Sequence, residues 1–276
     1  LLGHNGAGKS TAMKLILGIL APTSGRVRVF KEDPRGPASG RLRLKLGYLP
    51  ENVSFYGNLT GREVLRYFAR LKRVAPQEVG RLLTRVGLDD AAERRVRTYS
   101  KGMRQRLGLA QALLGQPRLM LLDEPTVGLD PMATRDVYNT IDELRARGTA
   151  IIISSHVLPG VETHVDRVAI LGRGSLLAEG TIDALRSRAE LPLTVRIRQQ
   201  ASAQAPGSDF HPAILAVSEE PDGSRVLTVP TGEKMSLLSA LVGLPGIEDL
   251  SVEPPTLEHL YAHFDTALSG RETQHV

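Results

Sequence analysis

A glycine-rich segment at the start of the chain constrains its fold more than any other feature. Residues 3–10 read Gly-His-Asn-Gly-Ala-Gly-Lys-Ser, which fits the phosphate-loop pattern G-x-x-x-x-G-K-[ST]. In such a loop the glycines let backbone amides close on phosphates, Lys9 meets the β and γ oxygens, and Ser10 holds Mg²⁺. The alternative is a plain glycine turn before a helix, but such a turn does not require Lys-Ser at the helix start. The residues expected to contact nucleotide are Gly3, His4, Asn5, Gly6, Ala7, Gly8, Lys9, Ser10 and Thr11.

Two adjacent carboxylates follow an aliphatic run further along the chain. The segment Leu-Met-Leu-Leu at 119–122 leads directly into Asp123 and Glu124. A buried strand ending there would deliver Asp123 to the Mg²⁺ and Glu124 to the place where a water attacks. A strand end that simply reaches solvent is the alternative, because acidic residues are frequent in turns. In combination with the phosphate loop, we predict Asp123 as a metal ligand and Glu124 as a catalytic residue.

The spacing of apolar residues predicts alternating helices and strands over the first 190 residues. The aliphatic runs are typical of strands buried on both faces of a parallel sheet, and a helix between two of them makes a βαβ unit. We also expect the strand before the phosphate loop to be cut short, with N-terminal strands missing, because the chain opens on Leu1-Leu2. Helices are expected at 9–20, 59–87 with Thr60 as the N-cap and a second short helix at 78–86, 103–114 and 131–147, and strands at 26–30, 119–122 and 149–154.

The pattern of polar and apolar residues changes after about residue 190. Residues 193–198 and 226–229 alternate like exposed strands, 201–209 resemble a linker, and 235–242 have the pattern of an amphipathic helix. We therefore predict a nucleotide-binding domain at 1–190, with a helical subdomain at about 52–115, and a small α+β accessory domain at 191–276.

Three further segments carry a family resemblance. Tyr-Ser-Lys-Gly-Met at 99–103 resembles the LSGGQ signature of ATP-binding-cassette (ABC) ATPases, with Ser100 and Gly102 matching. Gly-Leu-Asp at 128–130 resembles the D-loop of that family, and Ile-Ser-Ser-His at 153–156 resembles its switch histidine. Taken singly, an ordinary serine N-cap or a structural histidine would explain these residues. Together they imply an α/β P-loop ABC ATPase fold over residues 1 to about 190.

The resemblance implies where each partner of the reaction binds. ATP and Mg²⁺ are expected on one copy of the chain and to be capped by Ser100 and Gly102 of a second copy, in a head-to-tail homodimer. Asp130 is expected at the nucleotide, and His156 is expected to act on the γ-phosphate as a catalytic residue. One position departs from the family pattern, because Glu51 stands where most relatives place a glutamine that contacts metal and water.

Composition limits the location and the partners. No stretch approaches the ~18 apolar residues of a membrane span. Together with this observation, the family resemblance implies an integral membrane permease subunit on another chain, and we expect this chain in the cytoplasm, peripheral on the inner face of the membrane. The net charge is +5, but arginines are spread along the chain and aromatic residues make up only 4% of it. Because few side chains can stack on bases, no direct nucleic acid partner is expected.

Shorter stretches suggest a subgroup. Residues 251–260 resemble the tail of many ATPases of the ABC-2 type exporter group, and residues 49–56, 99–115 and 155–162 resemble the ATPase that serves nitrous oxide reductase maturation. That resemblance implies help in supplying copper sites, without a copper ligand in this chain, because it has no cysteine. The alternatives are an exporter of a drug, lipid or polysaccharide, a soluble ABC protein acting on nucleic acid or ribosomes, and a regulatory module that binds ATP without hydrolysing it. Glu51 and Lys101 suggest the last of these.

Overall fold

The computed structural model describes residues 1–155, 160–200 and 206–272. The chain divides into two compact units, Leu1–His164 with Leu171–Ser175, and Val165–Ile170 with Leu176–Val276. The hairpin formed by β4 (Val168–Gly172) and β5 (Ser175–Gly180) contributes to both. No helix in the described ranges is both long and apolar enough to cross a membrane.

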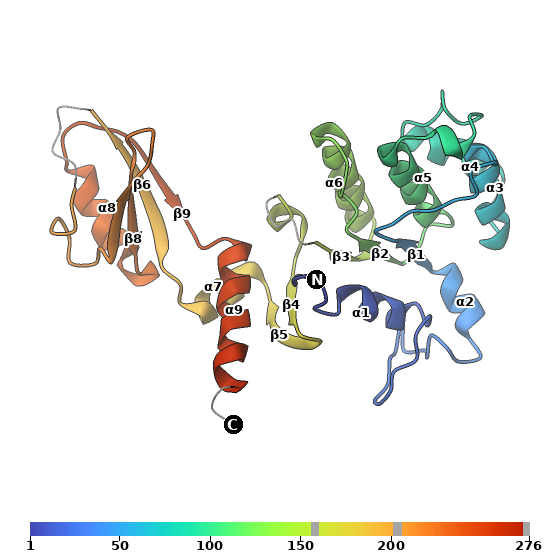
Figure 1. Cartoon of the computed structure of the whole chain (residues 1–276), viewed down its shortest axis with the longest axis horizontal. Coiled ribbons are helices and arrows are strands. Elements are labelled where there is room, and N and C mark those ends of the chain that lie inside the picture. Colours follow the sequence, from blue (N-terminus) through green and yellow to red (C-terminus); the bar gives the residue numbers. More distant parts are fainter. Residues whose placement is uncertain (156–159, 201–205, 273–276) are drawn as a thin grey trace. The chain divides into compact units, whose positions relative to one another are not determined.

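The first unit is built around a parallel sheet in the order β1-β2-β3. Figure 1 shows α1 on one face of this sheet and α5 and α6 on the other. Every residue of β2 is buried, as expected for a strand covered on both faces. The elements of this unit are α1 (Lys9–Ile16), α2 (Ser39–Leu44), β1 (Leu46–Leu49), α3 (Gly61–Leu71), α4 (Gln77–Arg85), α5 (Lys101–Leu113), β2 (Leu119–Asp123), α6 (Pro131–Ala146) and β3 (Ala150–Ser154), with 3₁₀ turns at Val96–Thr98 and Glu162–His164.

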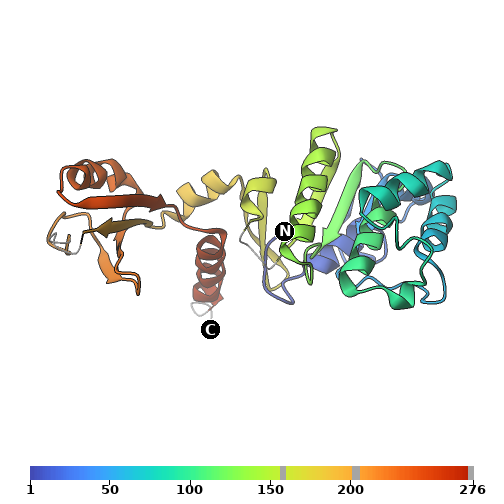
Figure 2. The same cartoon turned by 90° about the horizontal axis from the view of Figure 1, so that it is seen from above.

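Helices α3, α4 and α5 pack on one another (Figure 2), and they lie within the residues proposed above as the helical subdomain. The start of α3 confirms the N-cap expected at Thr60. The Thr60 hydroxyl accepts a hydrogen bond from the amide of Glu63 at 3.2 Å, and the Glu63 carboxylate accepts one from the amide of Thr60 at 2.8 Å. This reciprocal capping box satisfies two amides that the first turn of a helix leaves unpaired.

Two expectations for the first 30 residues are wrong. The helix predicted at 9–20 ends at Ile16, because the chain turns at Gly18 and leaves Ile19 62% exposed. The strand predicted at 26–30 does not form. A strand needs a neighbour for its backbone hydrogen bonds, and within the described ranges Val29 has a bridge only to Glu32, across a tight turn.

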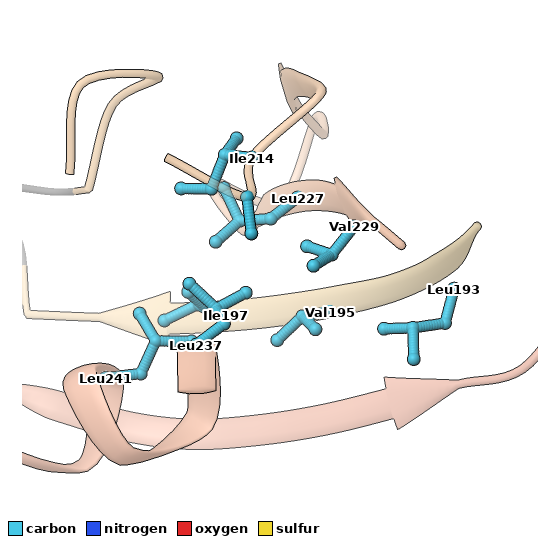
Figure 3. Packing of buried hydrophobic residues seen from close by; sticks show 9 residues of the cluster. Leu193, Val195, Ile197, Ile214, Leu227, Val229, Leu237 and Leu241 are labelled. Atoms are coloured by element: carbon cyan, nitrogen blue, oxygen red, sulfur yellow. The ribbon is translucent and has the colours of Figure 1, made fainter. Parts of the chain in front are cut away.

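The second unit contains the antiparallel sheet β7-β8-β6-β9. Alternate residues of the central strand β6 (Leu193, Val195 and Ile197) are buried beside Leu237 and Leu241 of α8 (Figure 3). The strands and the helix predicted from alternation are confirmed, whereas β7, β9, α7 and α9 were not predicted. The remaining elements are α7 (Ile182–Ala189), β6 (Leu193–Gln199), β7 (Ala216–Glu219), β8 (Arg225–Val229), α8 (Lys234–Val242), β9 (Ile247–Glu253) and α9 (Leu257–Glu272), with a 3₁₀ turn at Thr231–Glu233.

The division between the units falls earlier than residue 190. Helix α7 packs on α9 and therefore belongs with the second unit. Of the linker predicted at 201–209, residues 201–205 lie outside the described residues, and 206–209 form a loop that leads toward β7.

Candidate active site

The glycine-rich segment forms a loop that ends at the first residue of α1. Helix α1 begins at Lys9, and its N-cap Gly8 has a φ of 104°, which is left-handed backbone that glycine adopts without steric cost. No side chain caps this helix, so its first amides face the loop. The side chain of Lys9 is only 7% exposed, and its ammonium donates to the carbonyl oxygens of Gly3 at 2.6 Å and His4 at 3.2 Å. These bonds keep the ammonium inside the loop, where phosphate oxygens would bind.

Gly3 and Ala7 shape the loop through packing. A Cβ added at Gly3 would lie 2.6 Å from the carbonyl oxygen of Leu171 and 2.7 Å from the Cβ of Ala7, so no larger residue fits there. Ala7 is buried, and its carbonyl accepts a hydrogen bond from the amide of Gly174 at 3.2 Å. Leu171 and Gly174, which belong to the same unit as the loop, therefore hold it in place. Direct contact of Gly3 and Ala7 with a nucleotide stays a prediction.

The two carboxylates lie at the end of β2, where β3 supplies a residue that the sequence interpretation did not identify. Asp123 is paired in parallel register with Ser154, which is fully buried. The Ser154 hydroxyl donates to a carboxylate oxygen of Asp123 and accepts from the amide of Glu124 at 3.1 Å. The signal was present in the sequence, since polar residues end both aliphatic strands and parallel strands bring their carboxyl ends together.

Glu124 adopts strained backbone in a buried position. Its φ is 50°, in the left-handed region, and the residue is 5% exposed. A non-glycine residue there costs about 1–3 kcal/mol, and such residues cluster at functional sites. The amide of Glu124 is bonded to both the carbonyl and the hydroxyl of Ser154, which fixes the position of this residue.

A cavity of about 420 Å³ brings together most of the residues predicted to act on ATP and Mg²⁺. One ammonium and three carboxylates surround it, so a triphosphate would be repelled unless a cation lay between. The hydroxyl of Ser10 and the carboxylate of Asp123 are hard oxygen ligands of the kind that Mg²⁺ prefers. The donor set therefore fits a magnesium nucleotide. The residues lining the cavity are His4, Asn5, Gly6, Gly8, Lys9, Ser10, Thr11, Glu51, Asp123 and Glu124.

The signature and D-loop residues do not line this cavity. The Ser100 hydroxyl accepts from the amide of Met103 at 3.2 Å, and a carboxylate oxygen of Asp130 accepts from the amide of Ala133 at 2.8 Å. Both residues therefore cap helices, α5 and α6 respectively. The two motifs lie together, because a Cβ added at Gly102 would lie 3.6 Å from a methyl carbon of Leu129.

Two buried polar side chains connect these helices to the loop after Glu124. Gln105 of α5 is 4% exposed and donates to the carbonyl of Pro125 at 3.2 Å. Tyr138 of α6 is hydrogen-bonded to the hydroxyl of Thr126, and burial raises the pKa of its phenol, with a further rise from the charge of Glu124. Neither residue was predicted as a site residue, although Gln105 lies within the stretch 99–115 quoted above, and a polar residue on an apolar helical face was the available signal.

Burial also raises the pKa of the Tyr48 phenol, and the charge of Asp123 adds to that rise. Tyr48 therefore stays a neutral phenol on the strand beside β2 at physiological pH. His156, the predicted switch histidine, lies outside the described residues.

Comparison with known proteins identifies the family. Residues 1–127 match the family model described as ABC transporter. An uncharacterised ABC transporter ATP-binding protein of Bacillus subtilis is 37% identical over 257 residues, which cover 91% of this chain and 79% of that protein. The chain belongs to the ABC transporter ATP-binding proteins. As an ABC ATPase it has the P-loop fold that the motifs implied, and the similarity extends well beyond residue 190.

Two further comparisons place this ABC ATPase among its relatives. The daunorubicin resistance ATP-binding protein DrrA3 of Streptomyces coeruleorubidus is 32% identical over 272 residues, covering 95% of this chain and 85% of that protein. A solved structure described as the ATP-binding subunit of an ABC transporter has a TM-score of 0.64 and 33% identity, covering 68% of this chain and 80% of that one.

Proposed function

We propose that two copies of this chain bind ATP head to tail and hydrolyse it to drive a separate membrane permease. The observation that carries the proposal is the separation of the motifs within one chain. Lys9, Asp123 and Glu124 share a cavity, whereas Ser100 and Gly102 lie outside it. A phosphate site covered by signature residues therefore requires a second copy.

Each group in the cavity has a separate role in the proposed reaction. Lys9 would neutralise the β and γ oxygens, and Ser10 and Asp123 would hold Mg²⁺, which when bound would supply positive charge for the transferred phosphoryl group. Glu124 orients a water and accepts its proton as the water oxygen bonds to the γ-phosphorus and the bond to the β,γ-bridging oxygen breaks, releasing ADP. His156 is assigned to the γ-phosphate from its motif. Glu51 lines the same cavity and is proposed to contact Mg²⁺ or its water. Its carboxylate would then take the place of the glutamine side-chain amide that most relatives have at this position.

Mixing two inactive variants tests the composite site. Lys9→Ala removes the phosphate contact, and Ser100→Arg blocks the signature, so each protein alone should be inactive. A mixed dimer has one site with an intact Lys9 from one copy and an intact Ser100 from the other. We expect mixing to restore ATP hydrolysis to a measurable fraction of the wild-type rate. Two active single variants, or a mixture that stays inactive while ATP still forms mixed dimers, would contradict the proposal.

We propose that the helical subdomain contacts the permease. A cavity of about 360 Å³ lies among aromatic residues between residues 54–59 and α3, and Tyr56 and Tyr67 at this cavity are 77% and 53% exposed. Exposed aromatic residues at a recess are typical of protein interfaces. We expect Tyr56→Ser to reduce recovery of the chain with detergent-extracted membranes. A matched Met132→Ser change, at another exposed apolar residue, should leave recovery unchanged.

Two substrate hypotheses differ in the phenotype they predict. Drug export is our first candidate, because the relative from Streptomyces carries a drug-resistance name and covers nearly the whole chain. Maturation of the copper sites of nitrous oxide reductase is the second, supported by the resemblance of residues 49–56, 99–115 and 155–162. A strain without this chain should become drug-sensitive under the first hypothesis. Under the second hypothesis it should make nitrous oxide reductase deficient in copper.

Two other classes of ATP-binding protein predict different experimental results. A soluble ABC protein acting on nucleic acid or ribosomes should not be recovered with membranes. A regulatory module that binds ATP without hydrolysing it should release no phosphate in a single turnover. Glu124 is buried and held in a fixed position, which favours an enzyme that hydrolyses ATP over a regulatory module that only binds it.

A further inference from the structure

The second unit contains a cavity of about 690 Å³ that the ATPase reaction does not use. It lies where the sheet meets α9, between residues from β6, β8 and α9 and the two connections that precede β6 and α9. Its lining is chiefly apolar, with residues such as Leu191, Pro192 and Ala262. Sites for drug-sized molecules have volumes of roughly 300–1,000 Å³, mostly apolar walls and a few polar groups.

The polar groups on the sheet side are two threonines. Thr194 of β6 and Thr228 of β8 are direct cross-strand partners. Side chains alternate along β6, so Leu193, Val195 and Ile197 enter the core shown in Figure 3 and Thr194 lies on the opposite face. The paired threonines therefore place two hydroxyl groups side by side on the wall of the cavity, where each can donate or accept a hydrogen bond.

The polar groups on the helix side are two histidines one turn apart and Thr266, whose hydroxyl donates to the carbonyl of Ala262 at 2.8 Å. His259 and His263 are spaced i, i+4 on α9, and both line the cavity. The Nδ1 atom of His259 accepts a hydrogen bond from the amide of Thr256 at 3.3 Å. This bond assigns the neutral ring its proton on Nε2, so His259 is a hydrogen-bond donor through that nitrogen.

The walls of the cavity are fixed in place by contacts within the second unit. Arg186 of α7 donates to the carbonyl of Pro255 at 2.9 Å, and Thr231 donates to the carbonyl of Leu191 at 3.1 Å. The guanidinium of Arg188 lies 4.9 Å from the centre of the Phe264 ring, which attaches α9 to α7 (Figure 1). Both connections that border the cavity are thus anchored before any ligand binds.

No arginine, lysine, aspartate or glutamate lines this cavity in the described part of the chain. Charged residues on the Thr194 face of β6 are paired elsewhere, since Arg196 forms ion pairs with Glu220 and Glu253. An ionised ligand would lose its hydration without gaining a counter-charge, whereas a neutral one would not. We propose that this cavity binds a neutral, mostly apolar organic molecule of drug size, oriented by the two threonines and the two histidines.

Titration of the full chain with Nile red, an uncharged apolar dye with a carbonyl acceptor, tests the proposal. We expect a saturable rise in fluorescence with one dye bound per chain, unaffected by excess Mg-ATP. Ala262→Phe should fill the cavity and weaken binding at least about tenfold. Glu258→Phe adds the same ring to an exposed position of α9 that does not line the cavity, and it should leave the affinity unchanged.

Two more measurements distinguish binding in the cavity from the effects of misfolding and from nonspecific binding of the dye to the protein surface. Thr194→Val keeps the side-chain volume but removes one hydroxyl, and we expect it to weaken binding by about threefold to tenfold. Thermal unfolding followed by circular dichroism identifies a variant that fails to fold, and Ala262→Leu then replaces Ala262→Phe. Binding within twofold of wild type in both cavity variants would overturn the proposal. Equal affinity for anionic anilinonaphthalenesulfonate at the same site, or dye binding that disappears as copies of the chain associate, would also overturn it.

Discussion

The imidazole ring of His164 lies flat against the phenol ring of Tyr138, with ring centroids 4.5 Å apart and an angle of 3° between the planes. The Nδ1 atom of His164 is also 2.8 Å from a carboxylate oxygen of Asp142, which lies on α6 together with Tyr138. Tyr138 is in turn hydrogen-bonded to Thr126, two residues after Glu124. Helix α6 thus connects the segment that follows β3 to the loop that carries Glu124.

This connection predicts a specific effect of Tyr138→Phe on turnover. The change keeps the stacking on His164 and removes the hydrogen bond to Thr126. A neutral hydrogen bond contributes about 1 kcal/mol, so we expect kcat for ATP to fall about fivefold. The KM for ATP should stay within twofold, because the phosphate loop is untouched. Steady-state kinetics beside Tyr67→Phe, at an exposed tyrosine, check the result. A change in KM at constant kcat would show that Tyr138 acts elsewhere.

Ser154→Ala tests the support of the two carboxylates. The hydroxyl of Ser154 donates to Asp123, and its loss leaves the carboxylate free to rotate. Groups that orient a metal ligand typically change metal affinity by about 10–100-fold. We expect the Mg²⁺ concentration for half-maximal hydrolysis to rise about tenfold. Ser239→Ala, at an exposed serine of α8, is the control, and an unchanged Mg²⁺ requirement would assign Ser154 a purely structural role.

Part of this architecture could be predicted from sequence because its signals are local. The aliphatic runs around residues 119–122 and 149–154 and the cap at Thr60 each depend on a few neighbouring residues, and each prediction is confirmed. The phosphate loop and the Asp123-Glu124 pair were identified in the same way, and the structure brings them into one cavity.

The missed features depend on contacts between distant segments. Ser154 and Tyr138 each carry a weak local signal, but the partner of Ser154 is known only from the register of β2 and β3, and that of Tyr138 only from the packing of α6 beside Thr126. The prediction of a strand at 26–30 was wrong for the same reason, because the apolar residues of a segment do not indicate whether a neighbouring strand is available to pair with it. In β9, the sequence Ile-Glu-Asp-Leu-Ser-Val-Glu does not alternate strictly, and the strand forms through pairing with β6.

Three tyrosines with a raised pKa predict how stability responds to alkaline pH. Burial raises the pKa of Tyr99 above its ordinary value of 10.0, and the same holds for Tyr48 and Tyr138. Near pH 10 the unfolded chain therefore releases protons that the folded chain retains, so the free energy of unfolding falls as pH rises through that value. Urea unfolding at pH 8 and pH 10.5 measures this loss.

Tyr99→Phe is the variant that tests this assignment. It removes one raised pKa, so the loss of stability between the two pH values should be smaller than in wild type. At pH 8 the same variant should be about 1 kcal/mol less stable, because the carbonyl of Ala91 loses a hydrogen bond of 2.6 Å from the tyrosine hydroxyl. A loss with pH equal to that of wild type would mean that Tyr99 titrates normally.

If Glu124 accepts the proton of the attacking water, as we propose, then phosphate release should depend on its carboxylate, and Glu124→Gln removes that carboxylate. The glutamine keeps the size of the side chain and the backbone bonds to Ser154 but cannot accept that proton. We predict Mg²⁺-dependent release by the wild-type chain, a rate at least about 100-fold lower in Glu124→Gln, and ATP affinity within a few-fold of wild type. Phosphate release by Glu124→Gln at the wild-type rate would mean that another group accepts the proton.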